Sequence, residues 1–257
     1  MKRFFTTIIS IALVLGGAGA MVPAAAVTHA AQRAAVKFVP RQIKRANRRL
    51  RYTITAKYPQ ALGAARDPRL AKFNQALLGV VLKEVGGFTK DFQAPEERMS
   101  EVGSYFEAEY NVTLATNNLI SVWFGVSTFY EGAAHPNHNS KVFNYDLNAG
   151  RELKLADLFK PNSDYLKVVS DYAIKELTEK FRGEMPGEEP DTDWIREGAG
   201  PKAENYQNWN LSPKGLEINF DPYQVNSYAA GPQEVVIPLS ALRDVLDPNG
   251  PLGRMQH

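Results

Sequence analysis

A run of alternating apolar residues between Tyr105 and Phe129 constrains the fold of this sequence most strongly. This alternation has the period of a β-strand with one buried face. It is interrupted by the polar turn Thr116-Asn117-Asn118 and then resumes. The sequence therefore predicts a long β-hairpin with one apolar face. The residues expected on that face are Phe106, Ala108, Tyr110, Val112, Leu114, Ile120, Val122, Phe124 and Val126.

Two helical patterns and several shorter strands surround the hairpin. Asp67 and Pro68 fit the start of a first helix, and Gly86-Gly87 fit its end. A second helical face begins after Pro161, and Ser240 is expected to cap a short C-terminal helix. Because strands mostly follow strands, we predict an α+β fold, an antiparallel sheet with two substantial helices packed on it. The shorter strands are expected at residues 50–58, 142–147, 209–211, 216–220 and 235–237.

The N-terminus has the pattern of an export signal. Lys2 and Arg3 precede an apolar run, which small residues follow up to Ala30. We expect residues 1–30 to be a cleaved signal peptide and the mature chain to be extracytoplasmic, either periplasmic or secreted. Membrane attachment is expected only if this segment stays uncleaved. The sequence has no cysteine, so no disulfide stabilises the exported chain.

Charge is distributed unevenly along the chain. Residues up to Arg66 include twelve Lys and Arg and no Asp or Glu, whereas the remainder has 18 Lys and Arg against 28 Asp and Glu. We expect residues 31–49 to be a solvated basic leader, and no nucleic-acid partner because the chain is exported. The acidic body is either an ordinary soluble surface or complementary to a cationic partner.

An acidic stretch at residues 183–204 lacks a clear helical or strand pattern. A loop of this length is often mobile or functional. Its aromatic residue, Trp194, is expected either to anchor the loop or to contact a partner. The candidate binding residues in this stretch are Glu188, Glu189, Asp191 and Trp194.

The loop that follows the hairpin contains two histidines three residues apart. His135 and His138 alone cannot complete a zinc site, which needs at least three well-placed ligands. A general base would need a partner carboxylate, such as Glu131 or Asp146. The loop is otherwise structural, with Gly132 forming its turn, or it contacts a partner. The candidate binding residues here are Tyr130, Glu131, His135, Asn137 and His138.

Nucleophilic or phosphate-binding motifs are not evident. Ser121, Ser127 and Ser140 do not lie in a Gly-x-Ser-x-Gly setting, and no glycine-rich phosphate loop occurs. We therefore assign no catalytic residue, metal ligand or cofactor. Aromatic residues such as Trp123 and Trp209 suit either a core or a sugar-binding surface.

Three ordered motifs carry a resemblance to known envelope proteins. They are Gly132–Pro136, Phe143–Leu147 with Leu155–Phe159, and Phe220–Val225 with Glu234–Leu239. In this order they resemble the extracytoplasmic domain of RsiV-type anti-sigma factors. Residues 52–123 are similar to the preceding domain of that family, which also heads PdaC-type peptidoglycan deacetylases. We accordingly divide residues 50–250 into a PdaC/RsiV-type half, 50–130, and an RsiV-like half, 131–250, within one continuous unit.

The resemblance implies an α+β binding domain outside the membrane. In RsiV-type proteins this region recognises lysozyme and occupies its substrate cleft. We expect neither sigma-factor signalling nor deacetylase catalysis here. The leading hypothesis is a non-enzymatic envelope protein that binds a lysozyme-like muramidase or peptidoglycan. The alternatives are a cell-wall glycan hydrolase acting through His135 and a structural module without ligand.

Overall fold

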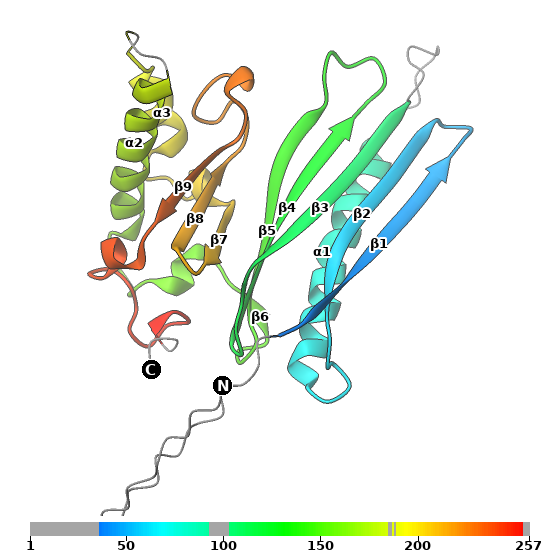
Figure 1. Cartoon of the computed structure of the whole chain (residues 1–257), viewed down its shortest axis with the longest axis horizontal. Helices are drawn as coiled ribbons and strands as arrows, with labels where there is room; N and C mark the ends of the chain where they lie inside the picture. The colour runs from blue at the N-terminus through cyan, green and yellow to red at the C-terminus, as the bar shows by residue number, and fades with distance from the viewer. Residues whose placement is uncertain (1–35, 93–102, 185–186, 188, 254–257) are drawn as a thin grey trace, which may run out of the picture. The chain divides into compact units, whose positions relative to one another are not determined.

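A six-stranded sheet with strand order β1-β2-β3-β4-β5-β6 forms the larger part of the fold (Figure 1). All neighbours are antiparallel except β2 and β3, which run parallel because helix α1 connects them. The strands are β1 (Phe38–Asn47), β2 (Tyr52–Ala61), β3 (Ser104–Ala115), β4 (Leu119–Phe129), β5 (Asn137–Asp146) and β6 (Arg151–Glu152).

This computed structural model describes residues 36–92, 103–184, 187 and 189–253. The expected signal peptide, residues 1–30, lies outside the described residues. No helix in the described part of the chain combines the length and hydropathy that a membrane crossing requires. The described residues all belong to one compact unit.

The predicted hairpin is confirmed as β3 and β4, with its turn at residues 116–118. The expected position of Leu114 is wrong, because the register shifts between Val112 and Leu114 and Leu114 packs against a different core from the rest of that face. Helix α1 (Pro68–Asp91) covers the apolar face of the sheet and buries Phe73, Leu77 and Val85 against it. The predicted end at Gly86-Gly87 is wrong, because the helix continues to Asp91. Burial of Phe88 against the sheet stabilises this last turn despite the two glycines.

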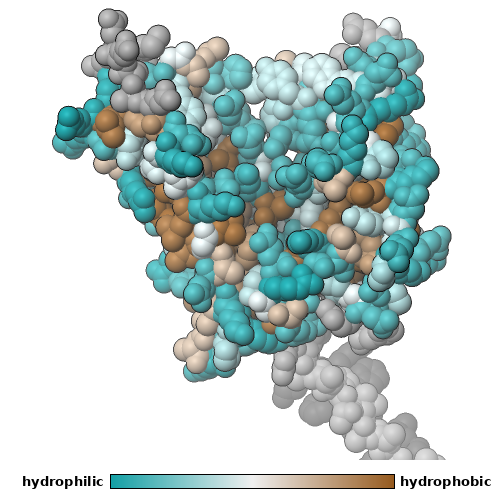
Figure 2. Space-filling view, turned by 180° about the vertical axis from the view of Figure 1, so that it is seen from behind, coloured by the Kyte–Doolittle hydropathy of each residue, from teal (hydrophilic) through white to brown (hydrophobic). Residues whose placement is uncertain are grey.

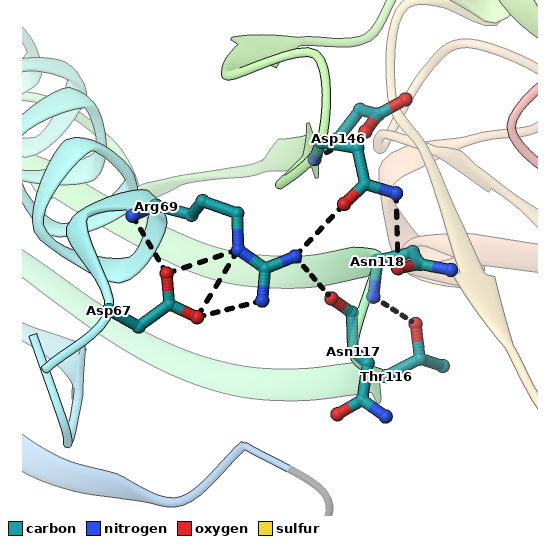
Figure 3. Close-up of polar contacts among 7 residues, drawn as sticks. Asp67, Arg69, Thr116, Asn117, Asn118 and Asp146 are labelled. Carbon is teal, nitrogen blue, oxygen red and sulfur yellow. Dashed lines mark hydrogen bonds and ion pairs between the residues drawn. The ribbon is translucent and has the colours of Figure 1, made fainter. Parts of the chain in front are cut away.

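A polar network fixes the start of α1 to two turns of the sheet (Figure 3). Asp67 caps the helix by accepting from the Arg69 backbone N–H, as predicted, and also pairs with the Arg69 guanidinium at 2.7 Å. Arg69 Nη1 donates to Asn148 Oδ1 at 2.9 Å, and Asn148 Nδ2 donates to Asn118 Oδ1 at 3.1 Å. Asp146 accepts from the backbone N–H groups of residues 148 and 149. The Asp67–Arg69 ion pair and the asparagine hydrogen bonds thus connect the start of α1 to the two turns.

The expected basic leader at residues 31–49 is wrong for Phe38–Asn47, which form edge strand β1. The strand pairs along its whole length with β2. Its apolar residues explain the pairing, because Phe38 packs edge-on against Phe73 at 6.2 Å between ring centroids. The basic side chains Arg41, Lys44 and Arg45 remain exposed.

A smaller antiparallel sheet packs with two helices around a second core (Figure 1). The expected single sheet is thus two sheets, although the α+β class is confirmed. The elements are β7 (Trp209–Ser212), β8 (Gly215–Phe220), β9 (Gln233–Ile237), α2 (Tyr165–Glu184) and α3 (Thr192–Ala199). Short 3₁₀ helices occur at Leu155–Leu158, Ala203–Tyr206, Tyr228–Ala230 and Leu239–Leu242.

Two further expectations about this part of the chain are corrected. Residues 192–199 of the expected irregular loop form α3, because Asp191 caps the helix and Ile195 and Ala199 are buried. The expected C-terminal helix is only the 3₁₀ turn Leu239–Leu242, whose cap position is Pro238 rather than Ser240.

Hydrophobic residues lie mainly in the two cores. On the side of the molecule opposite to that in Figure 1, hydrophilic residues cover most of the surface and hydrophobic ones gather toward the middle (Figure 2). The two sheets are joined by buried hydrogen bonds between Ser121, Asn144 and β7. This joint sets the position of the small sheet beside β3, β4 and β5.

Candidate functional site

Tyr130 and Glu131 fasten the start of the β4–β5 loop to the rest of the sheet. The Tyr130 ring stacks on Phe88 with 5.4 Å between centroids, and burial raises the pKa of its hydroxyl. The Glu131 side chain is fully buried and pairs with Arg51 at 3.1 Å. Gly132 forms the following turn at φ 98°, a conformation that favours glycine. These two candidate residues therefore have a structural role here.

His135 lies at the tip of the same loop and contacts a distant segment of the chain. Its ring packs on Tyr228 with 4.2 Å between centroids. Tyr228 donates its hydroxyl hydrogen bond to the Pro136 carbonyl at 2.9 Å. The loop tip is thereby attached to the 3₁₀ helix that begins at Tyr228. Asn137 and His138 instead begin strand β5, where both are exposed.

Trp194 reaches the same segment from helix α3. Its indole Nε1–H donates to the Tyr223 carbonyl at 3.0 Å, and the Tyr223 ring lies 5.5 Å from that of Tyr228. Close backbone packing makes this possible, because a Cβ on Gly198 would lie only 1.7 Å from the Gln224 carbonyl oxygen. The loop that contains His135 and the acidic segment that contains Trp194 were predicted as separate candidate regions, and both contact the segment around Tyr223 and Tyr228. We call His135, Trp194, Tyr223 and Tyr228 the aromatic surface.

Tyr223 has an unusual backbone conformation for a bulky residue. Its φ is 71°, in the left-handed region that non-glycine residues rarely adopt. Its side chain is 56% exposed, and among the large apolar side chains exposed by the described residues it alone is aromatic. Such strain costs about 1–3 kcal/mol and is concentrated at functional positions. The turn therefore holds an aromatic ring toward solvent at an energetic cost.

The acidic candidates lie near the start of α3, beside Trp194. Asp191 accepts from the N–H groups of Asp193 and Trp194, so it caps the helix. Glu189 forms an exposed pair with Arg182 at 3.2 Å, and the Asp193 side chain is 96% exposed. Glu188 lies outside the described residues. The described part of this segment thus places negative charge next to the aromatic surface.

The residues assigned to a possible hydrolytic site do not come together. Glu131 is engaged by Arg51, and Asp146 lies at the opposite end of β5 from His135. Ten extended residues span about 30 Å, so Asp146 is far from the loop tip. Within the described ranges, no three His, Asp or Glu side chains gather as metal ligands.

A polar cleft between the two sheets was not predicted from the sequence. It has a volume of about 510 Å³ and is lined by residues of β3, β4, β7, β8 and β9, among them Trp123, Asn210, Glu217, Asn219 and Glu234. Burial, followed by the charge of Glu217, raises the pKa of Glu234. The one sequence pattern that could have indicated the cleft is the alternation in β8, where Glu217 and Asn219 lie between apolar neighbours. That alternation also fits a solvent-exposed face.

Comparisons with known proteins find similarity to a described family over part of the chain. Residues 156–240 match the model described as "Protein of unknown function (DUF3298)". The peptidoglycan-N-acetylmuramic acid deacetylase PdaC of Bacillus subtilis is 29% identical over 175 residues, which cover 68% of this chain and 36% of PdaC. This confirms the expected similarity to PdaC-type proteins. Immunogenic protein MPB64 of Mycobacterium bovis is 29% identical over 115 residues, 45% of this chain and 47% of MPB64.

The chain therefore spans between about a third and a half of the length of these relatives. Solved structures agree with the fold. A DUF3298 family member from Bacteroides fragilis has a TM-score of 0.57 at 20% identity, covering 86% of this chain and 97% of the other. A DUF3298 family protein from Pseudomonas aeruginosa has a TM-score of 0.55 at 15% identity, covering 83% and 94%. At these identities the likeness concerns the fold alone.

Proposed function

We propose that this chain is an exported, non-enzymatic binding protein of the cell envelope, directed at a lysozyme-like muramidase through the aromatic surface. The similarity to PdaC, a peptidoglycan deacetylase by name, supports an extracytoplasmic, cell-wall-associated role. The RsiV-like motifs of the sequence support the muramidase as partner. Peptidoglycan itself is the other candidate ligand, and the experiment below separates the two.

The observation that carries the proposal is the strained, exposed Tyr223 within the aromatic surface. Aromatic residues dominate the binding energy of protein interfaces because they bury a large area with few rotatable bonds. The surface is held in place before binding, since His135 packs on Tyr228 and Trp194 bonds to the Tyr223 carbonyl. This preorganisation reduces the entropy lost on association.

Charge favours a basic partner. Glu189 and Asp193 are exposed beside Trp194, and their pairs with Arg182 and Arg196 are surface ion pairs of little energy. Acidic residues also exceed basic ones from Asp67 onward, 28 to 18. Complementary charge accelerates association and is screened by salt.

A hydrolytic role receives no support from the geometry around His135. The ring is packed on Tyr228, and its Nδ1 lies 2.9 Å from the Pro136 carbonyl oxygen. The carboxylates named as its partners are elsewhere, as described above.

The test is calorimetric titration of the mature chain with a C-type lysozyme at low and high salt, with lysis of cell-wall suspensions followed in parallel. We expect binding that weakens with salt and slows lysis. Binding to isolated peptidoglycan without binding to lysozyme would replace the proposed partner. Release of soluble glycan by the chain alone would overturn the non-enzymatic assignment.

The Tyr223→Gly variant separates a binding role from a structural one. Glycine adopts positive φ without strain, so the variant should unfold at the same or a higher denaturant concentration than the wild type. Its affinity for lysozyme should fall at least tenfold, because the exposed ring is lost. Leu62 is also exposed but does not have a positive φ, so Leu62→Gly does not match Tyr223→Gly as a control. Exposed Leu82→Ala serves as the control instead. That variant should bind normally.

A further inference from the structure

The cleft between the two sheets has the features of a ligand site distinct from the aromatic surface. Its volume of about 510 Å³ lies within the range of about 300–1,000 Å³ that is usual for small-molecule sites. One wall comes from β3 and β4, and the other from the small sheet. Packed sheets normally meet through apolar side chains. Here both walls carry polar side chains beside apolar ones, among them Asn111 and Thr113 on one wall and Asn210 and Asn219 on the other.

The two faces of the small sheet differ clearly in polarity. Leu216, Ile218 and Phe220 of β8 are buried in the second core. Between them, Glu217 and Asn219 line the cleft although each is only 9% exposed. Burial of polar groups is costly unless they are hydrogen-bonded. Their position beside an open volume therefore requires a specific explanation.

Hydrogen bonds hold these polar groups in a fixed order. Asn219 Nδ2 donates to Asn210 Oδ1 at 2.6 Å, and Asn210 Nδ2 donates to Glu217 Oε2 at 2.5 Å. Each amide uses only part of its donor and acceptor capacity in this chain. The unused donors and acceptors belong to side chains that line the cleft, and the existing hydrogen bonds already fix the orientation of these side chains.

Trp123 supplies an aromatic wall and a donor. Its indole lies across Gly125, where a Cβ would come within 2.7 Å of the ring. The indole Nε1 is buried and has no hydrogen-bond partner among the described residues. A buried N–H without an acceptor is costly, and an oxygen of a bound ligand would satisfy it.

We propose that this cleft binds a saccharide. Hydroxyl groups both donate and accept, as do the amides of Asn210 and Asn219, and the apolar face of a sugar ring stacks on an indole. An anionic ligand is disfavoured by Glu217 and Glu234, whose charges are only partly offset by Lys214. The acetamido and the free amino forms of a sugar share the hydroxyl chemistry, so both are tested.

The experiment titrates the full mature chain with tetramers of N-acetylglucosamine, glucosamine and glucose, followed by tryptophan fluorescence and calorimetry. We expect saturable binding of at least one tetramer. Preference for the acetylated tetramer would identify its carbonyl as the acceptor for Trp123, and preference for the amino form would identify recognition by the carboxylates; both outcomes support the proposal.

Matched variants locate the site and separate it from the proposed muramidase surface. Trp123→Phe keeps an aromatic ring, although a smaller one, and removes the indole N–H. We expect at least a tenfold loss of saccharide affinity, as for Asn219→Ala. Trp194→Phe and Tyr223→Gly alter the aromatic surface and should leave saccharide binding unchanged. Absence of saturable binding at millimolar tetramer, or binding unaffected by both cleft variants while each remains folded, would overturn the proposal.

Discussion

Replacement of Asn144 by alanine should strongly destabilise the protein, because Asn144 joins the two sheets. It is 2% exposed, and its Nδ2 donates to the Trp209 carbonyl of β7 at 2.7 Å. Its Oδ1 accepts from Ser121 Oγ at 2.5 Å, while Ser121 Oγ accepts from the Leu211 N–H at 2.9 Å. One side chain thus supports two of the hydrogen bonds at this joint and orients a third.

The magnitude follows from the groups left without partners. Asn144→Ala removes the donor to the Trp209 carbonyl and the acceptor for the Ser121 hydroxyl. A buried polar group that loses its partner costs about 1–3 kcal/mol. With two such groups, we expect the free energy of unfolding to fall by about 2–6 kcal/mol. For a domain of this size that corresponds to a Tm lower by about 4–24 °C.

The assay is equilibrium unfolding in urea, with Asn139→Ala as the matched control. Asn139 lies in the same strand but is exposed, so its replacement should change stability by less than about 0.5 kcal/mol. The double variant of Ser121→Ala and Asn144→Ala should lose less than the sum of the single variants, because the two side chains share a hydrogen bond. Equal losses for Asn144→Ala and Asn139→Ala would refute the reasoning.

Three further outcomes follow from the structure. Asp67→Ala should lower the free energy of unfolding by about 1–2 kcal/mol in urea titrations, because it removes the cap of α1, whereas exposed Lys175→Ala should have little effect. Gly198→Ala should cost about 1–3 kcal/mol in the same titrations and weaken lysozyme binding, since its Cβ would collide with the Gln224 carbonyl. Burial raises the folded pKa of Glu234 above 4.5, so the unfolded state loses this proton first; stability should therefore fall as pH rises from 4.5 through the folded pKa, and Glu234→Gln should flatten that fall.

Local patterns in the sequence were sufficient to predict the elements that bury one regular face. The β3–β4 hairpin keeps a period of two over most of both strands, with one register shift between Val112 and Leu114, and α1 has a strong start at Asp67 and Pro68. Helix α3 was missed because it is short and acidic, and it buries little beyond Ile195 and Ala199. Strand β1 was missed because its many basic residues outweighed the few apolar ones that hold it to the sheet.

The sites depended on contacts between distant residues. His135 and Trp194 were predicted as separate candidates, but neither pattern indicates that both contact the segment around Tyr223 and Tyr228. Glu217 was missed because a polar residue between apolar ones usually faces solvent. Only the packing of the small sheet beside β3 and β4 turns that face into a cleft.

The most direct test of the proposed function is hydrogen–deuterium exchange of the mature chain with and without a C-type lysozyme. Slower exchange is expected at residues 132–137, 192–199 and 221–230, which carry the aromatic surface, while exchange in β1 and β2 stays unchanged. Protection elsewhere with none at these three segments would contradict the account, as would exchange that lysozyme leaves unaltered throughout the chain.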